Sequence, residues 1–170
     1  MPRGPDTGMI IHEIFEQIFR TKAMWKDPLV MDQLIAKKLR FSPLACWETA
    51  VQQMVRKTMV MPLLGDGEFF TLSELDACQA EMEFIFSSQT GFVKGFIDLV
   101  FYRRQKVYFL DWKTHWLEDY GPLALQQTME AHDYNLQATL YAQAIKRHFK
   151  APFGGAYYIF VRGGTYAKIE

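Results

Sequence analysis

The chain has 170 residues, 49% of them hydrophobic and 15% aromatic, which favours one folded domain with a sizeable core and excludes a disordered chain. Lysine plus arginine and aspartate plus glutamate each number 19, so the net charge of zero disfavours a strongly basic, self-standing DNA-binding protein. No run of 18 apolar residues occurs, so no membrane-spanning helix is predicted. Cys46 and Cys78 lack the spacing of a metal site, and this cysteine usage fits a protein of the reducing cytoplasm.

The first third of the chain has the apolar spacing of helices. Helices are predicted over residues 8–22, 27–40 and 42–60. Asp27 is the expected cap of the second helix, with Pro28 at its first position, and Ser42 and Pro43 repeat that pattern before the third. Residues 63–70, with the sequence LLGDGEFF, are expected to form a loop.

From Ala80 the pattern changes to that of β-strands. Strands are predicted at residues 81–86, 91–102 and 106–114. A helical region follows from Leu123 to Phe149, broken near His132–Asp133, and a last strand is predicted at residues 154–164. This order predicts an α/β fold in which helices flank a mixed β-sheet, with an N-terminal helical segment.

Two carboxylates interrupt the two most apolar strands. The polar tetrad RRQK between them predicts a hairpin that turns at Arg104–Gln105. In that register Asp98 lies opposite Asp111, and Lys113 shares the face of Asp111 because side chains alternate along a strand. A slip of one residue would send Asp98 to the other face.

Two opposed carboxylates require a positive partner. Directly opposed residues have Cβ atoms about 4.5–5.5 Å apart, and two unit charges at about 5 Å repel by about 3 kcal/mol at an effective dielectric constant near 20. A divalent cation such as Mg²⁺ would offset this repulsion, and Lys113 would assist it. Such an ion also activates water and stabilises charge on a reacting phosphate. The alternative is structural, since a D-x-K motif is by itself more often a surface ion pair.

The motifs GFIDLVF, YFLDWKTHWL and HDYNLQATLYAQAI together resemble those of the PD-(D/E)xK nuclease superfamily and, within it, the RecB-type nuclease domains. The resemblance extends over about residues 8–163 and implies a restriction-endonuclease-like core. It also implies that residues 1–7 are the remnant of a linker and that residues 8–170 are a nuclease domain excised from a longer chain.

The resemblance assigns metal ligands residue by residue. Asp98 and Asp111 match the two acidic ligands, and the main-chain carbonyl of Trp112 matches a third. His12, in GMIIHEIFE, matches a histidine ligand on the first helix. Without the resemblance, His12 on an amphipathic helix is more simply a structural residue.

Three further residues match catalytic positions of the family. Lys113 matches the catalytic lysine, and Gln137 and Tyr141 match the Q-x3-Y motif, which implies that they orient the DNA backbone or the lysine and its carboxylates. Their i, i+4 spacing places Gln137 and Tyr141 on one helix face, where core packing is the alternative explanation. Glu83 is a candidate outer acid or an exposed strand residue, and His115 is interpreted as structural.

The function implied by the resemblance is a magnesium-dependent DNA nuclease, with Mn²⁺ able to substitute. The parent would be an ATP-dependent exodeoxyribonuclease of the exodeoxyribonuclease V type, which joins RecC- and RecD-like subunits in recombinational repair of double-strand breaks. The phosphate-loop motif GxxxxGK[ST] is absent, so ATP hydrolysis would belong to another part of that assembly. The alternative is a catalytically inactive, nuclease-like domain that binds DNA or serves as a scaffold. A nuclease with a four-cysteine cluster is excluded, because the chain has only two cysteines.

Overall fold

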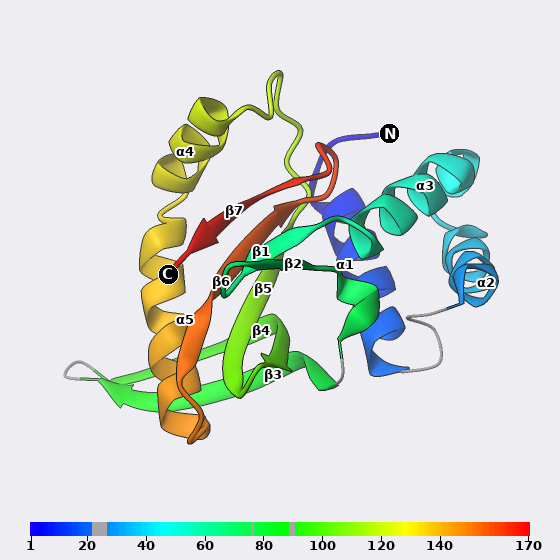
Figure 1. Ribbon diagram of the computed structural model, residues 1–170. Helices are drawn as coiled ribbons and strands as arrows, with labels where there is room; N and C mark the ends of the chain where they lie inside the picture. The colour runs from blue at the N-terminus through cyan, green and yellow to red at the C-terminus, as the bar shows by residue number, and fades with distance from the viewer. Residues whose placement is uncertain (22–26, 76, 89–90) are drawn as a thin grey trace.

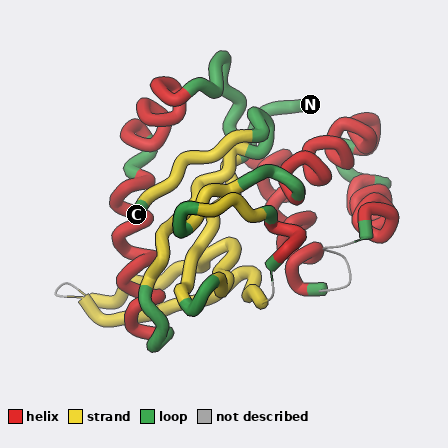
Figure 2. Tube along the Cα trace, viewed as in Figure 1, coloured by secondary structure: helices red, strands yellow, loops and turns green. Residues whose placement is uncertain are grey.

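The computed structural model describes residues 1–21, 27–75, 77–88 and 91–170 and shows an α/β fold built on a five-stranded mixed sheet (Figures 1 and 2). The strands lie in the order β3 (Ala77–Ser88), β4 (Gly91–Arg103), β5 (Lys106–Lys113), β6 (Phe153–Phe160) and β7 (Thr165–Ile169). Strands β5 and β6 are parallel, whereas the other neighbouring pairs are antiparallel. The predicted fold class, helices on both sides of a mixed sheet, is confirmed.

Three helices near the N-terminus, α1 (Pro5–Arg20), α2 (Pro28–Leu39) and α3 (Glu48–Met59), lie on one side of the sheet (Figure 1). The Asp27 carboxylate accepts hydrogen bonds from the backbone N–H groups of Leu29 and Val30, so Asp27 caps α2 as predicted. Helix α3 begins later than predicted. The Ser42 hydroxyl accepts a hydrogen bond from the Leu44 N–H in a turn, and a short 3-10 helix, Ala45–Trp47, follows before α3. Lys22, at the end of the first predicted helix, lies outside the described residues.

The prediction of a loop at residues 63–70 was wrong, because these residues form a small hairpin of β1 (Leu63–Gly65) and β2 (Glu68–Phe70). Its turn residues Asp66 and Gly67 adopt positive φ angles of 52° and 77°, which an Asp-Gly pair tolerates well. A short 3-10 helix, Leu72–Glu74, then leads towards β3.

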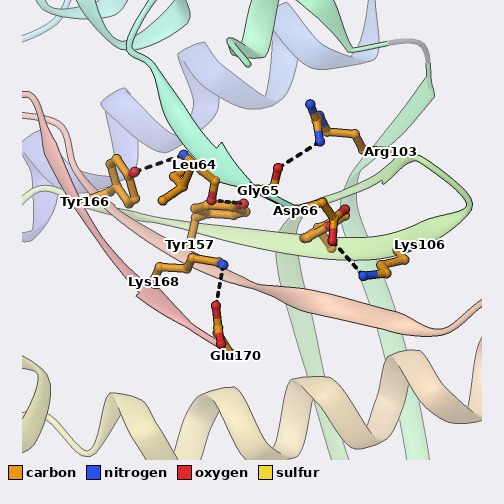
Figure 3. A network of polar contacts seen from close by, with 10 residues as sticks. Leu64, Gly65, Asp66, Arg103, Lys106, Tyr157, Tyr166, Lys168 and Glu170 are labelled. Atoms are coloured by element: carbon orange, nitrogen blue, oxygen red, sulfur yellow. Dashed lines mark hydrogen bonds and ion pairs between the residues drawn. The ribbon is translucent and has the colours of Figure 1, made fainter. Parts of the chain in front are cut away.

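Figure 3 shows how polar contacts fasten this hairpin to the sheet. The Tyr157 hydroxyl donates to the Leu64 carbonyl at 2.9 Å, and the Leu64 N–H donates to the Tyr166 hydroxyl at 3.0 Å. Arg103 donates to the Gly65 carbonyl at 3.1 Å, and Lys106 binds Asp66 at 2.6 Å. Side chains of the main sheet therefore bind backbone groups of Leu64 and Gly65 in β1.

The parallel pair is joined by the helices on the other side of the sheet, α4 (Pro122–Ala131) and α5 (Tyr134–His148) (Figure 1). The break predicted near His132–Asp133 is confirmed, since Asp133 has a left-handed conformation with φ 53° and ψ 31°. Strand β7 was not predicted. It is only five residues long and partly exposed, so its sequence carries little signal beyond the glycines that precede it.

The sheet separates two hydrophobic cores. One lies against α1, α2 and α3 and includes Phe15, Leu99, Leu110, Trp112 and Tyr157. The other lies against α4 and α5 and includes Met82, Val100, Phe109, Ile145 and Tyr158. No described helix is long and apolar enough to cross a membrane.

Candidate active site

Strands β4 and β5 part where the two predicted acids lie. Their last paired residues are Leu99 and Leu110, in the register predicted for the hairpin, so the ladder stops just before Asp98 and Asp111. Beyond that point Asp98 Oδ2 accepts a hydrogen bond from the backbone N–H of Trp112 at 2.7 Å. The carboxylate accepts the hydrogen bond that a carbonyl of β4 would accept in a continuous ladder. We call the place where the two strands separate, just beyond Leu99 and Leu110, the fork.

Asp111 and Lys113 form a buried ion pair on β5. Their relative exposures are 4% and 8%, and Lys113 Nζ lies 2.7 Å from Asp111 Oδ2. Burial raises the pKa of Asp111, and the neighbouring charge of Asp98 raises it further, while Lys113 opposes both effects. The attraction of the ammonium therefore does not outweigh the effects of burial and of the Asp98 charge on this pKa.

His12 reaches the fork from α1. Its Nδ1 lies 3.5 Å from Asp98 Oδ2. Burial alone would lower the pKa of His12, but the hydrogen bond and the attraction to Asp98 outweigh burial, so this pKa is raised. The predicted histidine is thus placed beside the first predicted acid, from an element far away in the sequence.

Trp112 contributes its side chain and its backbone to different parts of the molecule. The indole is buried and stacks on Phe15 with ring centroids 4.1 Å apart. The N–H and C=O of one strand residue point to the same edge, so the Trp112 carbonyl faces the side on which its N–H meets Asp98. The next carbonyl, that of Lys113, points the other way and accepts the Val161 N–H at 3.1 Å.

Helix α5 brings the predicted glutamine and tyrosine to the lysine. Lys113 Nζ donates to Gln137 Oε1 at 3.4 Å, and Gln137 Nε2 donates to the Tyr141 hydroxyl at 2.9 Å. The Tyr141 ring packs edge-on against Phe109 of β5, with centroids 5.4 Å apart. Gln137 thus touches the lysine directly, whereas Tyr141 fixes the orientation of the glutamine amide.

The donor set has the chemistry of a site for a hard cation. Among the described residues, no three histidine, cysteine, aspartate or glutamate side chains converge closely enough to hold an ion as they stand. They are drawn instead into two pairs, His12 with Asp98 and Asp111 with Lys113. Two carboxylates whose repulsion raises a pKa, an imidazole and a backbone carbonyl are nevertheless suitable donors, and the charge at the fork is what a divalent cation would offset.

Sequence reasoning missed Glu81. The register of β3 and β4 continues past Ala80–Leu99 to Met82–Ile97, so Glu81 lies opposite Asp98. Its positive φ of 50° marks a local distortion of the strand, and burial together with the charge of Asp98 raises the pKa of Glu81. The signal was available once Asp98 was chosen, because the facing residue on the preceding strand follows from the hairpin register.

Glu83, the acid that sequence analysis considered in that strand, is an exposed surface residue. Its carboxylate pairs with Lys94 at 2.6 Å, and both side chains are more than half exposed. Of the two interpretations of Glu83, the structure supports the exposed strand residue.

A strand fork with two acids and a buried lysine, on a mixed sheet flanked by helices, defines a nuclease-like α/β domain. The model of the PD-(D/E)XK nuclease superfamily matches residues 2–169, so the chain belongs to that superfamily.

The relatives described next are all of one kind of protein, the RecB subunit. The chain is 30% identical over 208 aligned residues to the RecBCD enzyme subunit RecB of Escherichia coli strain K12, covering 95% of this chain and 17% of that protein. It is 28% identical to the RecB subunit of Borreliella burgdorferi, with 95% of this chain and 17% of that one covered. The RecB subunit of Chlamydia pneumoniae is 27% identical, with 86% and 14% covered. The chain is therefore a PD-(D/E)XK nuclease domain similar to part of RecB, and it spans less than a fifth of the length of these relatives.

Proposed function

We propose that this domain hydrolyses phosphodiester bonds of DNA with the help of Mg²⁺, for which Mn²⁺ can substitute. The observation that carries the proposal is the fork between β4 and β5, where Asp98 accepts the Trp112 N–H and the flanking residues Asp111 and Lys113 form a buried ion pair. The fork lies between two interior strands of the sheet, so the proposal requires a phosphate to reach it where β4 and β5 separate.

Each residue has a defined part in this proposal. Asp98, Asp111, His12 and the Trp112 carbonyl would hold the cation. When bound, a divalent cation lowers the pKa of water and neutralises charge that develops on the reacting phosphate. The Lys113 ammonium orients the attacking water or donates to a phosphate oxygen, because its hydrogens are fixed by Asp111 and Gln137. Gln137 and Tyr141 hold the ammonium in that orientation.

The similarity to RecB supports a larger proposal. The domain acts as the nuclease part of an ATP-dependent exodeoxyribonuclease of the RecBCD type, with RecC- and RecD-like partners, in the repair of double-strand breaks by recombination. Such partners would deliver the DNA and supply phosphate-binding charge that this chain, with a net charge of zero, does not carry.

A cleavage assay on end-labelled linear DNA with Mg²⁺ tests the proposal. The domain should cut DNA, EDTA should stop it, and Asp98→Ala should be inactive while remaining folded by circular dichroism. Calorimetry with Mn²⁺ separates this function from a DNA-binding scaffold. Binding of Mn²⁺ that is lost in Asp98→Ala supports the nuclease, whereas no binding, or equal binding by the variant, supports the scaffold.

A further inference from the structure

An aromatic ring lies against the buried lysine. Lys113 Nζ is 3.7 Å from the centre of the Tyr134 ring and 5.2 Å from that of Tyr158. An ammonium this close to a ring face is attracted by the ring's electron density, and the attraction grows when water is excluded. Lys113 is only 8% exposed, so water is largely excluded from this contact and the attraction is strengthened.

The chain fixes Tyr134 by both its backbone and its ring. Asp133 turns the chain through a left-handed conformation, which makes Tyr134 the first residue of α5. Aspartate tolerates that conformation better than most residues. The buried Tyr158 then donates its hydroxyl to the Tyr134 carbonyl at 3.0 Å, and the two rings stack with centroids 5.4 Å apart and planes at 19°.

Two histidines contact Tyr134. His132 stacks on Tyr134 at 5.3 Å and 15°, and the Tyr134 hydroxyl lies 3.4 Å from His115 Nε2. Burial and the charge of Asp111 raise the pKa of Tyr134 to about 12, so the phenol stays neutral near pH 7. Sequence analysis gave His115 a structural part only, and the structure makes it a neighbour of the ring that touches the lysine.

These contacts leave the ammonium little freedom. Of its three hydrogens, one is directed to Asp111 at 2.7 Å and one to Gln137 at 3.4 Å, while the Tyr134 ring lies against it. We propose that Tyr134 is a positioning residue for Lys113, whose ring holds the ammonium in place beside the carboxylates of the fork. This inference rests on the proposed function, in which Lys113 acts in cleavage.

Two variants of Tyr134 separate the ring from the hydroxyl. Tyr134→Leu removes the ring face, and kcat for DNA cleavage should fall by about 10- to 100-fold with KM little changed, because a small displacement of a reacting group costs about that much. Tyr134→Phe keeps the ring and should restore most of the lost kcat. Tyr102→Leu is the control, because it removes another tyrosine ring, which packs edge-on against Phe149 and lies away from the fork.

A second readout does not depend on cleavage. In protein labelled with ¹³C at the lysine ε-carbon, the Lys113 signal, assigned with Lys113→Arg, should be shifted upfield by the Tyr134 ring. The shift should persist in Tyr134→Phe and Tyr102→Leu and vanish in Tyr134→Leu. A positioning role predicts that loss of the shift and loss of kcat occur together.

The outcomes distinguish this inference from the proposed function. An unshifted Lys113 signal in the wild type, or full kcat in Tyr134→Leu when Lys113→Ala is inactive, would overturn the role of Tyr134 alone. A Tyr134→Phe variant as slow as Tyr134→Leu would overturn it too, because the hydroxyl rather than the ring would then be required. Cleavage that survives Lys113→Ala would overturn the proposed function, and the role of Tyr134 with it.

Discussion

Strand β5 has a lysine at each end, and each lysine is paired with an aspartate. Lys106 lies 2.6 Å from Asp66 at the hairpin end, and Lys113 lies 2.7 Å from Asp111 at the fork. The hydrogen bonds from Lys106 and Tyr108 lower the pKa of the exposed Asp66. At the fork, burial and the charge of Asp98 raise the pKa of Asp111 despite its lysine.

The difference shows what burial does to one kind of ion pair. The exposed pair favours the ionised carboxylate and fastens a small hairpin to the sheet (Figure 3). At the fork the carboxylate of Asp98 adds negative charge that the neutral Asp111–Lys113 pair does not balance, and such charge beside a buried pair is costly unless a ligand uses it. Asp111, whose pKa is raised beside a second acid, is accordingly at the place where we propose that the chemistry occurs.

The largest contrast should appear in cleavage. Asp111→Ala and Lys113→Ala should each lower kcat/KM for DNA cleavage by at least about 100-fold, because each removes a group that acts on the reacting phosphate or water. Asp66→Ala and Lys106→Ala, the same changes at the other end of β5, should leave cleavage unchanged. Circular dichroism and thermal melting would verify that all four variants are folded. Undiminished cleavage in either purified fork variant would refute its role.

Metal affinity should depend steeply on pH. The pKa values of Asp111 and His12 are both raised, so these groups remain protonated to higher pH than an ordinary ligand and must lose their protons to bind a cation. The affinity for Mn²⁺ should fall as the pH is lowered through these raised values, by about tenfold per pH unit for each protonated ligand. Calorimetry across this range, in buffers of different ionisation enthalpy, would also detect the released protons. A flat profile would count against these two ligands.

The contact of Gln137 with the lysine should have a smaller effect. Hydrogen bonds to charged groups contribute about 1.5–3 kcal/mol, so Gln137→Ala should slow cleavage by about 10- to 100-fold at most. Gln126→Ala is the matched control on α4, since its amide binds Glu130 at 3.0 Å on an exposed surface. Equal rates for the two variants in single-turnover assays would show that Gln137 has no part in cleavage.

The smallest effect concerns stability at the hairpin end. Asp66 has a lowered pKa in the folded protein, so it stabilises the fold above its ordinary pKa, and this stabilisation is lost as the pH falls through the lowered value. Because the pair is exposed and screened by solvent, Asp66→Asn should lower the free energy of unfolding by at most about 1 kcal/mol at neutral pH. Urea unfolding at neutral and acid pH would measure this difference, which should shrink in acid and in high salt. A difference that grew in acid would have the wrong sign.

The sequence contained enough information to predict the register of the hairpin whose strands carry the two aspartates. The turn at Arg104–Gln105, where both residues have positive φ angles of 49° and 63°, produced the predicted register. That register followed from a polar tetrad between two apolar runs and the alternation of side chains along strands. The parting of the strands after Leu99 could not be predicted, because it depends on a side chain replacing a backbone acceptor.

Other features depend on contacts between distant residues. The hairpin of β1 and β2 has three residues in each strand and is fastened by side chains of Arg103, Lys106 and Tyr157, which no local pattern reveals. Tyr134, which meets Lys113, is the first residue of α5 and directly follows the left-handed residue that separates α4 from α5. Local periodicity therefore predicts the elements, whereas the neighbours of the lysine follow from how the elements pack.

The most direct test of the central claim is a crystal soaked in Mn²⁺, with the ion located by anomalous scattering. The account predicts an anomalous peak at the fork, within coordination distance of the carboxylates of Asp98 and Asp111. A peak elsewhere with none at the fork, or a fully soaked crystal in which these carboxylates bind no ion, would contradict it.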